Sequence, residues 1–307
     1  MRIVIAQALL IALCCSSAFA GKGWFSGKEP DAWADNSVVY GEVISVAECG
    51  RGTAKIELRI LVTLAGRVDA AREYVIDSVI GYGCTDIEIE KPPPAKSRCI
   101  AHLIQHYDLS TTGKMIMGRP VISGELVPFM PKQASIVVVS GLDDPKAEQI
   151  IARLRDLRAT LWPTSATTWP QKFDGEEENL WEDHSIVFAE VAEVTDLEKY
   201  RATINLNIKA AITGRVDPAL DSRVPFRIAY GHDGTAIKEL PKAKSRVLVV
   251  LRRMSDRRLA VSDNYFLFMP DKSPITVVSG LDDPKVKQII SRLRELRKPR
   301  PADPPWK

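Results

Sequence analysis

The chain contains the same segment twice, and this duplication constrains its fold more than any other feature of the sequence. Trp33 and Trp181 lie 148 residues apart, and this offset aligns the two copies without a gap as far as position 106. Identical runs at this offset include GRVD (66–69 and 214–217), YG (82–83 and 230–231) and AKSR (95–98 and 243–246). A period this long indicates two whole domains, because solenoid units repeat every 20 to 50 residues, roughly.

The second copy lacks nine residues within the stretch that corresponds to 107–122, and beyond this gap the offset is 139. The run SGLDDPK then occurs unchanged at 140–146 and 279–285. A length of 307 residues also suits two domains. We therefore expect two copies of one fold, at 37–158 and 185–298.

Alternating apolar and polar residues dominate each copy, as in half-buried antiparallel strands. In 54–64, for example, Ile56, Leu58 and Ile60 lie on one face, and 202–212 repeats this pattern. We expect five strands in the first copy, at 38–44, 54–64, 74–80, 99–105 and 120–129, with a short apolar extension at 136–139. The last two strands of the second copy are expected at 247–251 and 259–268.

Each copy then ends in a helix. Asp144 precedes Pro145, which is typical of an N-cap followed by proline at the first helical position. Asp283 and Pro284 repeat this arrangement. Apolar residues follow at helical spacing, at Ile150, Ile151, Leu154 and Leu157. We interpret the two aspartates as helix caps rather than as catalytic acids.

The first 20 residues have the order of a secretory signal peptide: a positive charge, an apolar core and a small-residue cleavage site, Ala18-Phe19-Ala20. The apolar core is too short to span a bilayer, and no later stretch is long enough. We expect a secreted or periplasmic protein that begins at Gly21 and has no transmembrane segment in the mature chain. The remaining segments are a lead-in at 21–36, a Pro/Thr/Ser linker with a second lead-in at 159–184, and a disordered tail at 299–307.

Three cysteines remain after signal cleavage, which is an odd number for an oxidising compartment. Cys84 and Cys99 flank the loop between the third and fourth strands, and Cys49 ends the first strand. We therefore expect all three at one end of the first copy, with at most one disulfide. Cys84–Cys99 ranks first and Cys49–Cys84 second.

The charge balance excludes a strongly basic nucleic-acid binder, because 42 Lys and Arg oppose 39 Asp and Glu. Cations do gather in the last helix and the tail. They form a possible surface for an anionic partner, at Lys287, Arg294, Lys298 and Arg300. The alternative is a solvated helix face whose late cations complement the helix dipole.

Several runs resemble the netrin-like, tissue-inhibitor-of-metalloproteinase-like OB-fold domains. SVVYGEVISV (37–46) and RILVTLAGRV (59–68) resemble the first strand of that class and its second strand with a Gly turn. In the second copy the same features are found at 185–194, 207–216 and 245–253. The resemblance implies a mainly β protein of two tandem five-stranded OB-like antiparallel barrels, each closed by a C-terminal α-helix.

The resemblance does not imply protease inhibition. The inhibitors of this class chelate the protease zinc through a processed amino-terminal cysteine. Here the expected mature terminus is Gly21, and the first mature cysteine is Cys49. The fold can carry over without the function.

The histidines do not predict a metal site, and we expect no cofactor. His102 and His106 have zinc-helix spacing, but their segment is expected to be a strand, on which they would lie roughly 13 Å apart. His184 aligns with Asn36, and His232 is likewise present in one copy only, so the shared fold needs neither.

No nucleophile elbow, P-loop or dinucleotide fingerprint is present in the sequence. We expect a non-catalytic binding or structural module of the cell envelope or exterior, whose partner is an unknown protein or an anionic envelope polymer. The enzymatic alternative is a secreted hydrolase with dispersed catalytic residues, which predicts side chains that converge in a pocket. A purely architectural protein predicts a flat surface.

Overall fold

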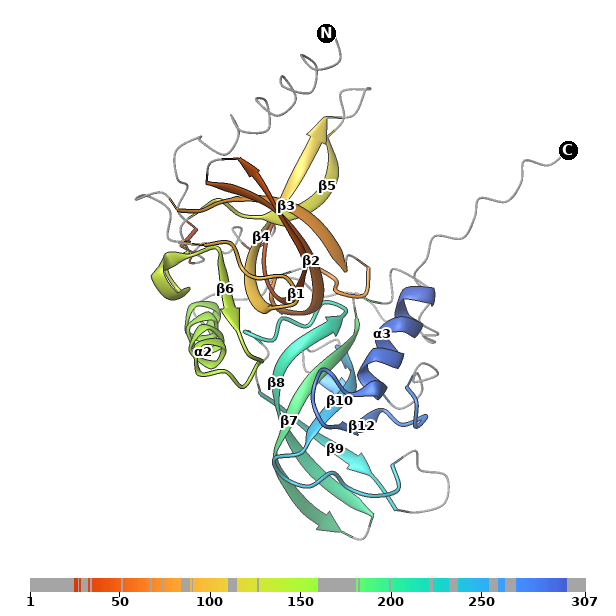
Figure 1. Cartoon of the computed structure of the whole chain (residues 1–307). Coiled ribbons are helices and arrows are strands. Elements are labelled where there is room, and N and C mark those ends of the chain that lie inside the picture. The colour runs from red at the N-terminus through yellow and green to blue at the C-terminus, as the bar shows by residue number, and fades with distance from the viewer. Residues whose placement is uncertain are drawn as a thin grey trace, which may run out of the picture. The chain divides into compact units, whose positions relative to one another are not determined.

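A computed structural model of the chain describes most of both repeats (Figure 1). The described residues are 25–26, 28, 33, 35–50, 52–66, 68–72, 74–83, 89, 91–109, 115–125, 127–159, 181, 183–198, 200–220, 223–231, 237–253, 259–262 and 269–296. The expected signal peptide and tail lie outside them.

The described residues form twelve strands, two α-helices and one short 3-10 helix, η2 (Pro131–Gln133). The first repeat contains β1 (Asn36–Gly50), β2 (Thr53–Ala65), β3 (Val75–Gly81), β4 (Arg98–Leu109), β5 (Met115–Ile122), β6 (Ile136–Val139) and α2 (Pro145–Ala159). The second contains β7 (His184–Glu198), β8 (Arg201–Thr213), β9 (Arg223–Ala229), β10 (Arg246–Arg253), β11 (Leu259–Val261), β12 (Ile275–Val278) and α3 (Pro284–Leu296).

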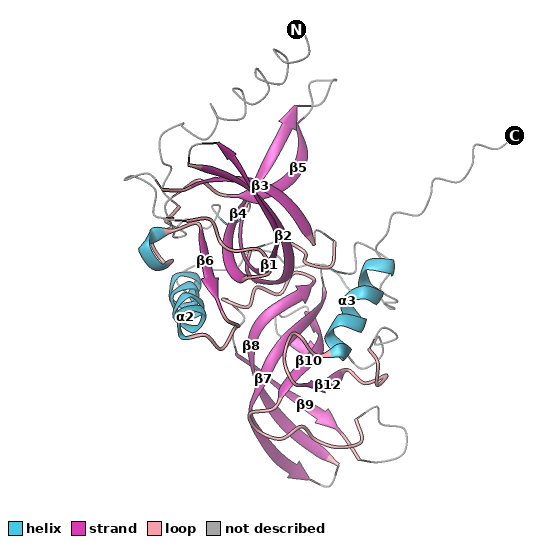
Figure 2. Cartoon of the chain, in the orientation of Figure 1, coloured by secondary structure: helices cyan, strands magenta, loops and turns pink. Residues whose placement is uncertain are grey.

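The two repeats have the same strand neighbours. β4 pairs with β1, β5 and β6 in the first repeat, and β10 pairs with β7, β11 and β12 in the second. The register also agrees, because Tyr40 pairs with Ile100 and the equivalent Phe188 pairs with Leu248. The chain is therefore mainly β and antiparallel, and its two halves share one topology, as the duplication predicts (Figure 2).

The strands form a single 12-stranded sheet, so the expectation of two closed barrels is wrong. The sheet order is β11-β10-β7-β8-β2-β1-β4-β5, with β3 on β2, β6 on β4, β9 on β8 and β12 on β10. β3 and β5 do approach each other, because the Ile122 amide donates to the Ser78 hydroxyl over 2.9 Å. The Ser78 side chain thus accepts the Ile122 N–H that a backbone ladder between β3 and β5 would use to close the barrel. Two residues earlier, Pro120 has no N–H to offer on that edge of β5.

The fifth strand of each repeat differs from its predicted range. β5 ends at Ile122 and β11 at Val261, well before the expected ends at 129 and 268. Val127, Phe129 and Met130 are apolar because they are buried in the loop that leads into η2. The β4–β5 hairpin is longer than the β10–β11 hairpin, as the nine-residue gap predicts.

The predicted alternation in the long strands is confirmed. Ile56, Leu58 and Ile60 in β2 have no exposed surface, and Ile204 and Ile208 in β8 repeat this. In the second repeat these strands contribute to a core that also includes Val249, Phe226 and Ile275.

The geometry of the GRVD turn after the second strand explains why its glycine and aspartate are the same in both repeats. Gly66 has φ +91°, and a Cβ atom there would collide with the backbone of Asn36 and Ser37. The Ser37 hydroxyl accepts from the Val68 amide over 3.1 Å, and the Asp69 carboxylate accepts from the Ala71 amide over 2.9 Å. The second repeat has the same glycine conformation and both bonds, at Gly214, Ser185 and Asp217.

The two aspartates cap their helices, as predicted. The Asp144 carboxylate accepts from the Lys146 amide over 2.9 Å and from the Ser140 amide over 2.8 Å. Asp283 makes the same bonds to Lys285 and Ser279. These amide donors hold the pKa of both carboxyl groups below the ordinary value.

The chain divides into two compact units, with a boundary between Leu161 and Trp162, inside the expected linker. Two short segments of the first copy, Leu61–Ala65 and Asp69–Tyr74, belong to the second unit. Neither described α-helix is long and apolar enough to cross a membrane.

Candidate functional site

The two described cysteines, Cys49 and Cys99, are both free thiols. Cys99 is fully buried on β4, opposite Gly41, and its burial raises the pKa of its thiol to about 12. Cys49 is an exposed free thiol near the end of β1. It is eight residues beyond Gly41, or about 26 Å along an extended strand. Cys49 and Cys99 therefore do not lie at the same end of the repeat, contrary to expectation. Cys84 lies outside the described residues, so a disulfide to it stays a prediction.

His102 is a core residue. Its side chain is fully buried, stacks on Phe25 with ring centroids 4.4 Å apart, and has Nε2 2.8 Å from the Asn36 Oδ1. Burial lowers the pKa of its imidazole to about 3, so the ring is neutral. Phe25 and Trp33 also contact Phe129, which anchors the lead-in on the first repeat.

The histidines do not form a metal site among the described residues, which contain no suitable group of three ligands. His102 and His106 both lie on β4, as the strand interpretation required. His184 is buried in the second repeat, at the position equivalent to Asn36. His232 lies outside the described residues.

The basic surface expected on the last helix is only partly exposed. Lys287 is exposed, but the Arg294 guanidinium lies 3.9 Å from the ring centroid of Tyr74, within the second unit. Lys298 and Arg300 lie outside the described residues. Two further cations of α3 are paired: Lys285 with Asp271 over 3.1 Å, and Arg292 with Glu295 over 3.4 Å. Val286, Ile289, Ile290 and Leu293 form the buried stripe of this helix, while Leu296 is half-buried.

A row of charged side chains crosses the strands of the first repeat. Arg98 on β4 is the register partner of Glu42 on β1. The Glu42 carboxylate lies 3.3 Å from Arg98 and 3.6 Å from Arg59 on β2. Val75 on β3 pairs with Arg59 and ends the row. The two arginines of this row thus share the carboxylate of Glu42.

The second repeat has an equivalent row, in which one arginine is on β9 instead of β8. Arg246, Glu190, Asn207 and Arg223 are successive register partners across β10, β7, β8 and β9. Asn207 stands where the first repeat has Arg59, and Arg223 stands where it has Val75. Glu190 pairs with Lys209 over 3.8 Å. The Arg223 side chain is exposed and makes no hydrogen bond or ion pair with any described residue.

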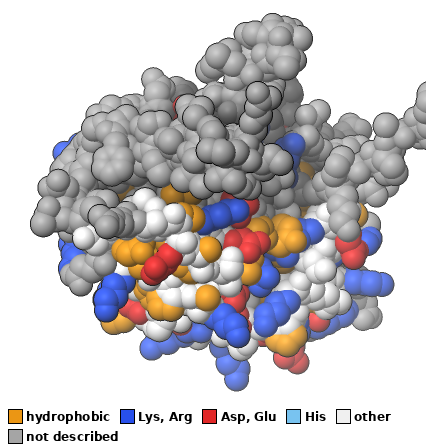
Figure 3. All heavy atoms as spheres, turned by 45° about the horizontal axis from the view of Figure 1, so that its top comes forward, with side chains coloured by type: hydrophobic (Ala, Val, Ile, Leu, Met, Phe, Trp, Pro, Cys, Tyr) orange, Lys and Arg blue, Asp and Glu red, His pale blue; other side chains and the backbone are white. Residues whose placement is uncertain are grey.

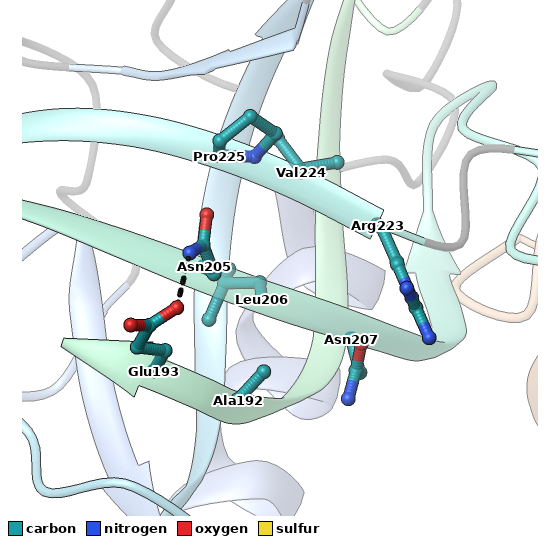
Figure 4. A pocket seen from close by; sticks show the side chains of 8 residues that line it. All are labelled: Ala192, Glu193, Asn205, Leu206, Asn207, Arg223, Val224 and Pro225. Carbon is teal, nitrogen blue, oxygen red and sulfur yellow. Dashed lines mark hydrogen bonds between the residues drawn. The ribbon is translucent and has the colours of Figure 1, made fainter.

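Arg223 and Asn207 line an open groove of about 460 Å³ on β7, β8 and β9. They lie at one end of it, and Glu193 and Asn205 lie at the other, where the Asn205 amide donates to Glu193 over 3.1 Å (Figure 4). The remaining lining residues are Ala192, Leu206, Val224 and Pro225. This is the candidate site: a guanidinium beside an amide, without a nucleophile or acid–base pair.

The coloured part of the face seen in Figure 3 does not carry one broad basic patch. On the face seen in Figure 3, blue Lys and Arg side chains are interspersed with acidic and hydrophobic ones. On this face an anion would be held by a specific cluster rather than by a general positive field.

The sequence analysis missed Asn205, Asn207 and Arg223. The signal that could have found them is the pairwise comparison of polar strand positions between the copies, since Glu57, Arg59 and Val75 are their equivalents.

No known family model matches the sequence, and no curated protein is significantly similar to it.

Proposed function

We propose that this chain is an exported, non-catalytic binding protein that takes a carboxylate-bearing polymer on the exposed face of its second repeat. The observation that carries the proposal is the uncompensated Arg223 beside Asn207 in the groove. Their Cβ atoms are about 5 Å apart as cross-strand partners. A guanidinium fork binds both oxygens of a carboxylate, and an adjacent amide N–H can add a third bond.

Three titratable residues outside the groove have structural roles, which supports binding rather than turnover. The buried His102 is neutral and enclosed by aromatic rings, and Asp144 and Asp283 are occupied as helix caps. The export signal at 1–20 would deliver the protein to a compartment that contains acidic polymers. As the finer part of this proposal, each repeat is an opened OB-like arrangement, which the strand order β3-β2-β1-β4-β5 supports.

The proposal is tested by titrating the purified protein with sodium polygalacturonate, with neutral dextran and phosphatidylglycerol vesicles as comparison ligands. We expect binding to polygalacturonate that weakens as NaCl rises from about 20 to about 300 mM. Arg223→Val, which restores the residue of the first repeat, should weaken it by about tenfold. Arg227→Val removes the same charge from the same strand outside the groove and should leave affinity within about twofold.

Two results would contradict the proposal. Equal affinity of wild type and Arg223→Val would remove the groove from recognition. Binding to the vesicles but not to polygalacturonate would replace the carboxylate partner with a phosphate surface.

A further inference from the structure

We propose that Lys96 and Lys244 are a second pair of contacts for the acidic polymer, one in each repeat. This inference rests on the proposed function and extends it, because it makes both repeats, and not only the groove of the second, part of the binding surface. The two lysines occupy the same place in the identical AKSR runs.

Both lysines have a positive φ angle, a backbone conformation that is unfavourable for lysine. Lys96 has φ +65° in the turn Pro94–Ser97, which the Ser97 amide closes by donating to the Pro94 carbonyl over 3.2 Å. Lys244 has φ +66°, and the Ser245 amide donates to the Lys242 carbonyl over 3.0 Å. The third position of such a turn favours Gly or Asn, because a Cβ atom crowds the backbone there.

The turn itself does not require a lysine side chain. The Lys96 amide donates to the Val43 carbonyl over 2.6 Å, and the Lys244 amide donates to Val191 over 2.7 Å. Any residue except proline would make these bonds. Both side chains are exposed, and neither ammonium group has a hydrogen bond or ion pair with a described residue. Lysine therefore costs conformational energy here without stabilising the described fold.

Glu42 and Arg98 are retained and form an ion pair in the first repeat, but several other charges on its strands were not retained. Glu57, Arg59 and Asp77 of the first repeat correspond to Asn205, Asn207 and Pro225 of the second. Against this divergence, two unpaired lysines in a strained conformation point to a use for the side chain. Strained backbone of this kind is concentrated at functional sites.

The position of each lysine connects it to the row of its own repeat. Lys244 is bonded to Val191, which immediately precedes the groove residues Ala192 and Glu193. Lys96 is bonded to Val43, next to Glu42 of the first row. One cation in each repeat suits a ligand with many acidic groups, because such a ligand can present a separate acid to each lysine. Two such contacts reinforce each other through effective concentration.

The test is the double variant Lys96→Gly/Lys244→Gly in the purified protein, titrated with sodium polygalacturonate. We expect affinity to fall by about tenfold or more at low salt, while the unfolding temperature stays the same or rises because the turn strain is relieved. Binding of monomeric galacturonate should change much less. Lys96→Arg/Lys244→Arg should keep polymer binding.

Lys272→Gly is the matched control. Lys272 is also exposed with φ +49°, but its equivalent in the first repeat is Gln133, so lysine is not retained there. This variant loses one lysine charge at a positive-φ position, where the double variant loses two, and it should bind the polymer as wild type does.

The outcomes separate the two proposals. If the double glycine variant binds as wild type while Arg223→Val does not, the lysine contacts are overturned and the groove stands. If Lys272→Gly weakens binding as much as the double variant, general charge explains the effect and the lysine contacts are again overturned. If wild type does not bind the polymer, both proposals fail.

Discussion

The Asn205 amide of β8 donates a hydrogen bond to the Glu193 carboxylate of β7 over 3.1 Å, and the first repeat has the same cross-strand contact with the acid on the opposite strand. There the Ser45 hydroxyl of β1 donates to Glu57 of β2, also over 3.1 Å. One contact has thus been kept through a change of both residues.

Exchanging this pair provides the first prediction. Asn205→Glu alone places a carboxylate opposite Glu193 and should destabilise the protein by about 0.5 to 1 kcal/mol through like-charge repulsion. The double variant Glu193→Ser/Asn205→Glu recreates the pair of the first repeat and should recover this loss. Urea unfolding at low and high salt measures both. A double variant that is no more stable than Asn205→Glu would show that the two positions are not coupled.

The features predictable from sequence were those set by local backbone geometry. The glycine at position 66, with φ +91°, and the Asp–Pro step at 144–145 each suit a local turn or cap that few residue types favour. The alternation in 54–64 likewise reports one buried face. These features occur twice, which made the shared topology predictable.

The predictions that were wrong concern features that depend on contacts between residues far apart in the sequence. Whether β5 closes on β3 is decided by Ser78 and Pro120, which are far apart in the sequence. Phe129 and Met130 extend an apolar run beyond the end of a strand because burial in a loop selects the same residues.

The candidate groove escaped prediction for the same reason. Asn207 and Arg223 are ordinary surface residues until the register of β8 and β9 places them opposite each other. The basic helix was more conspicuous in sequence, but aromatic stacking of Arg294 and an ion pair of Arg292 are invisible there.

The GRVD turn provides a second prediction. Gly66→Ala and Gly214→Ala should each destabilise the protein by about 2 kcal/mol or more, because both glycines have φ +91° and a Cβ atom would collide with the first strand of the repeat, β1 or β7. Gly124→Ala is the control, since a Cβ atom added there would meet no other atom within 4 Å. It should change stability by less than about 0.5 kcal/mol. Similar losses for all three in urea unfolding would contradict the proposed role of backbone geometry.

Thiol reactivity gives a third prediction. In a Cys84→Ser variant, the exposed Cys49 should react with iodoacetamide at pH 8, whereas the buried Cys99, whose thiol pKa is raised to about 12, should not. Addition of denaturant should expose Cys99 to the reagent. Peptide mapping by mass spectrometry measures each site. Native-state labelling of Cys99 at a rate similar to that of Cys49 would show that β4 is not buried as described.

The last prediction concerns how stability changes at acidic pH, and the direction of this change follows from His102. Burial lowers the folded-state pKa of this imidazole to about 3, whereas a histidine in an unfolded chain titrates near about 6.5. Between these values the unfolded state binds the proton and the folded state does not. The free energy of unfolding should therefore be fully maintained above about pH 6.5 and fall as the pH decreases toward 3. His102→Val, which places the residue of the second repeat at this position, removes this term but leaves His184 unchanged. Between pH 7 and pH 5 the wild type should lose about 2 kcal/mol more than the variant in urea unfolding. Equal losses, or a Cε1–H resonance of His102 that titrates above pH 5, would contradict the buried neutral imidazole.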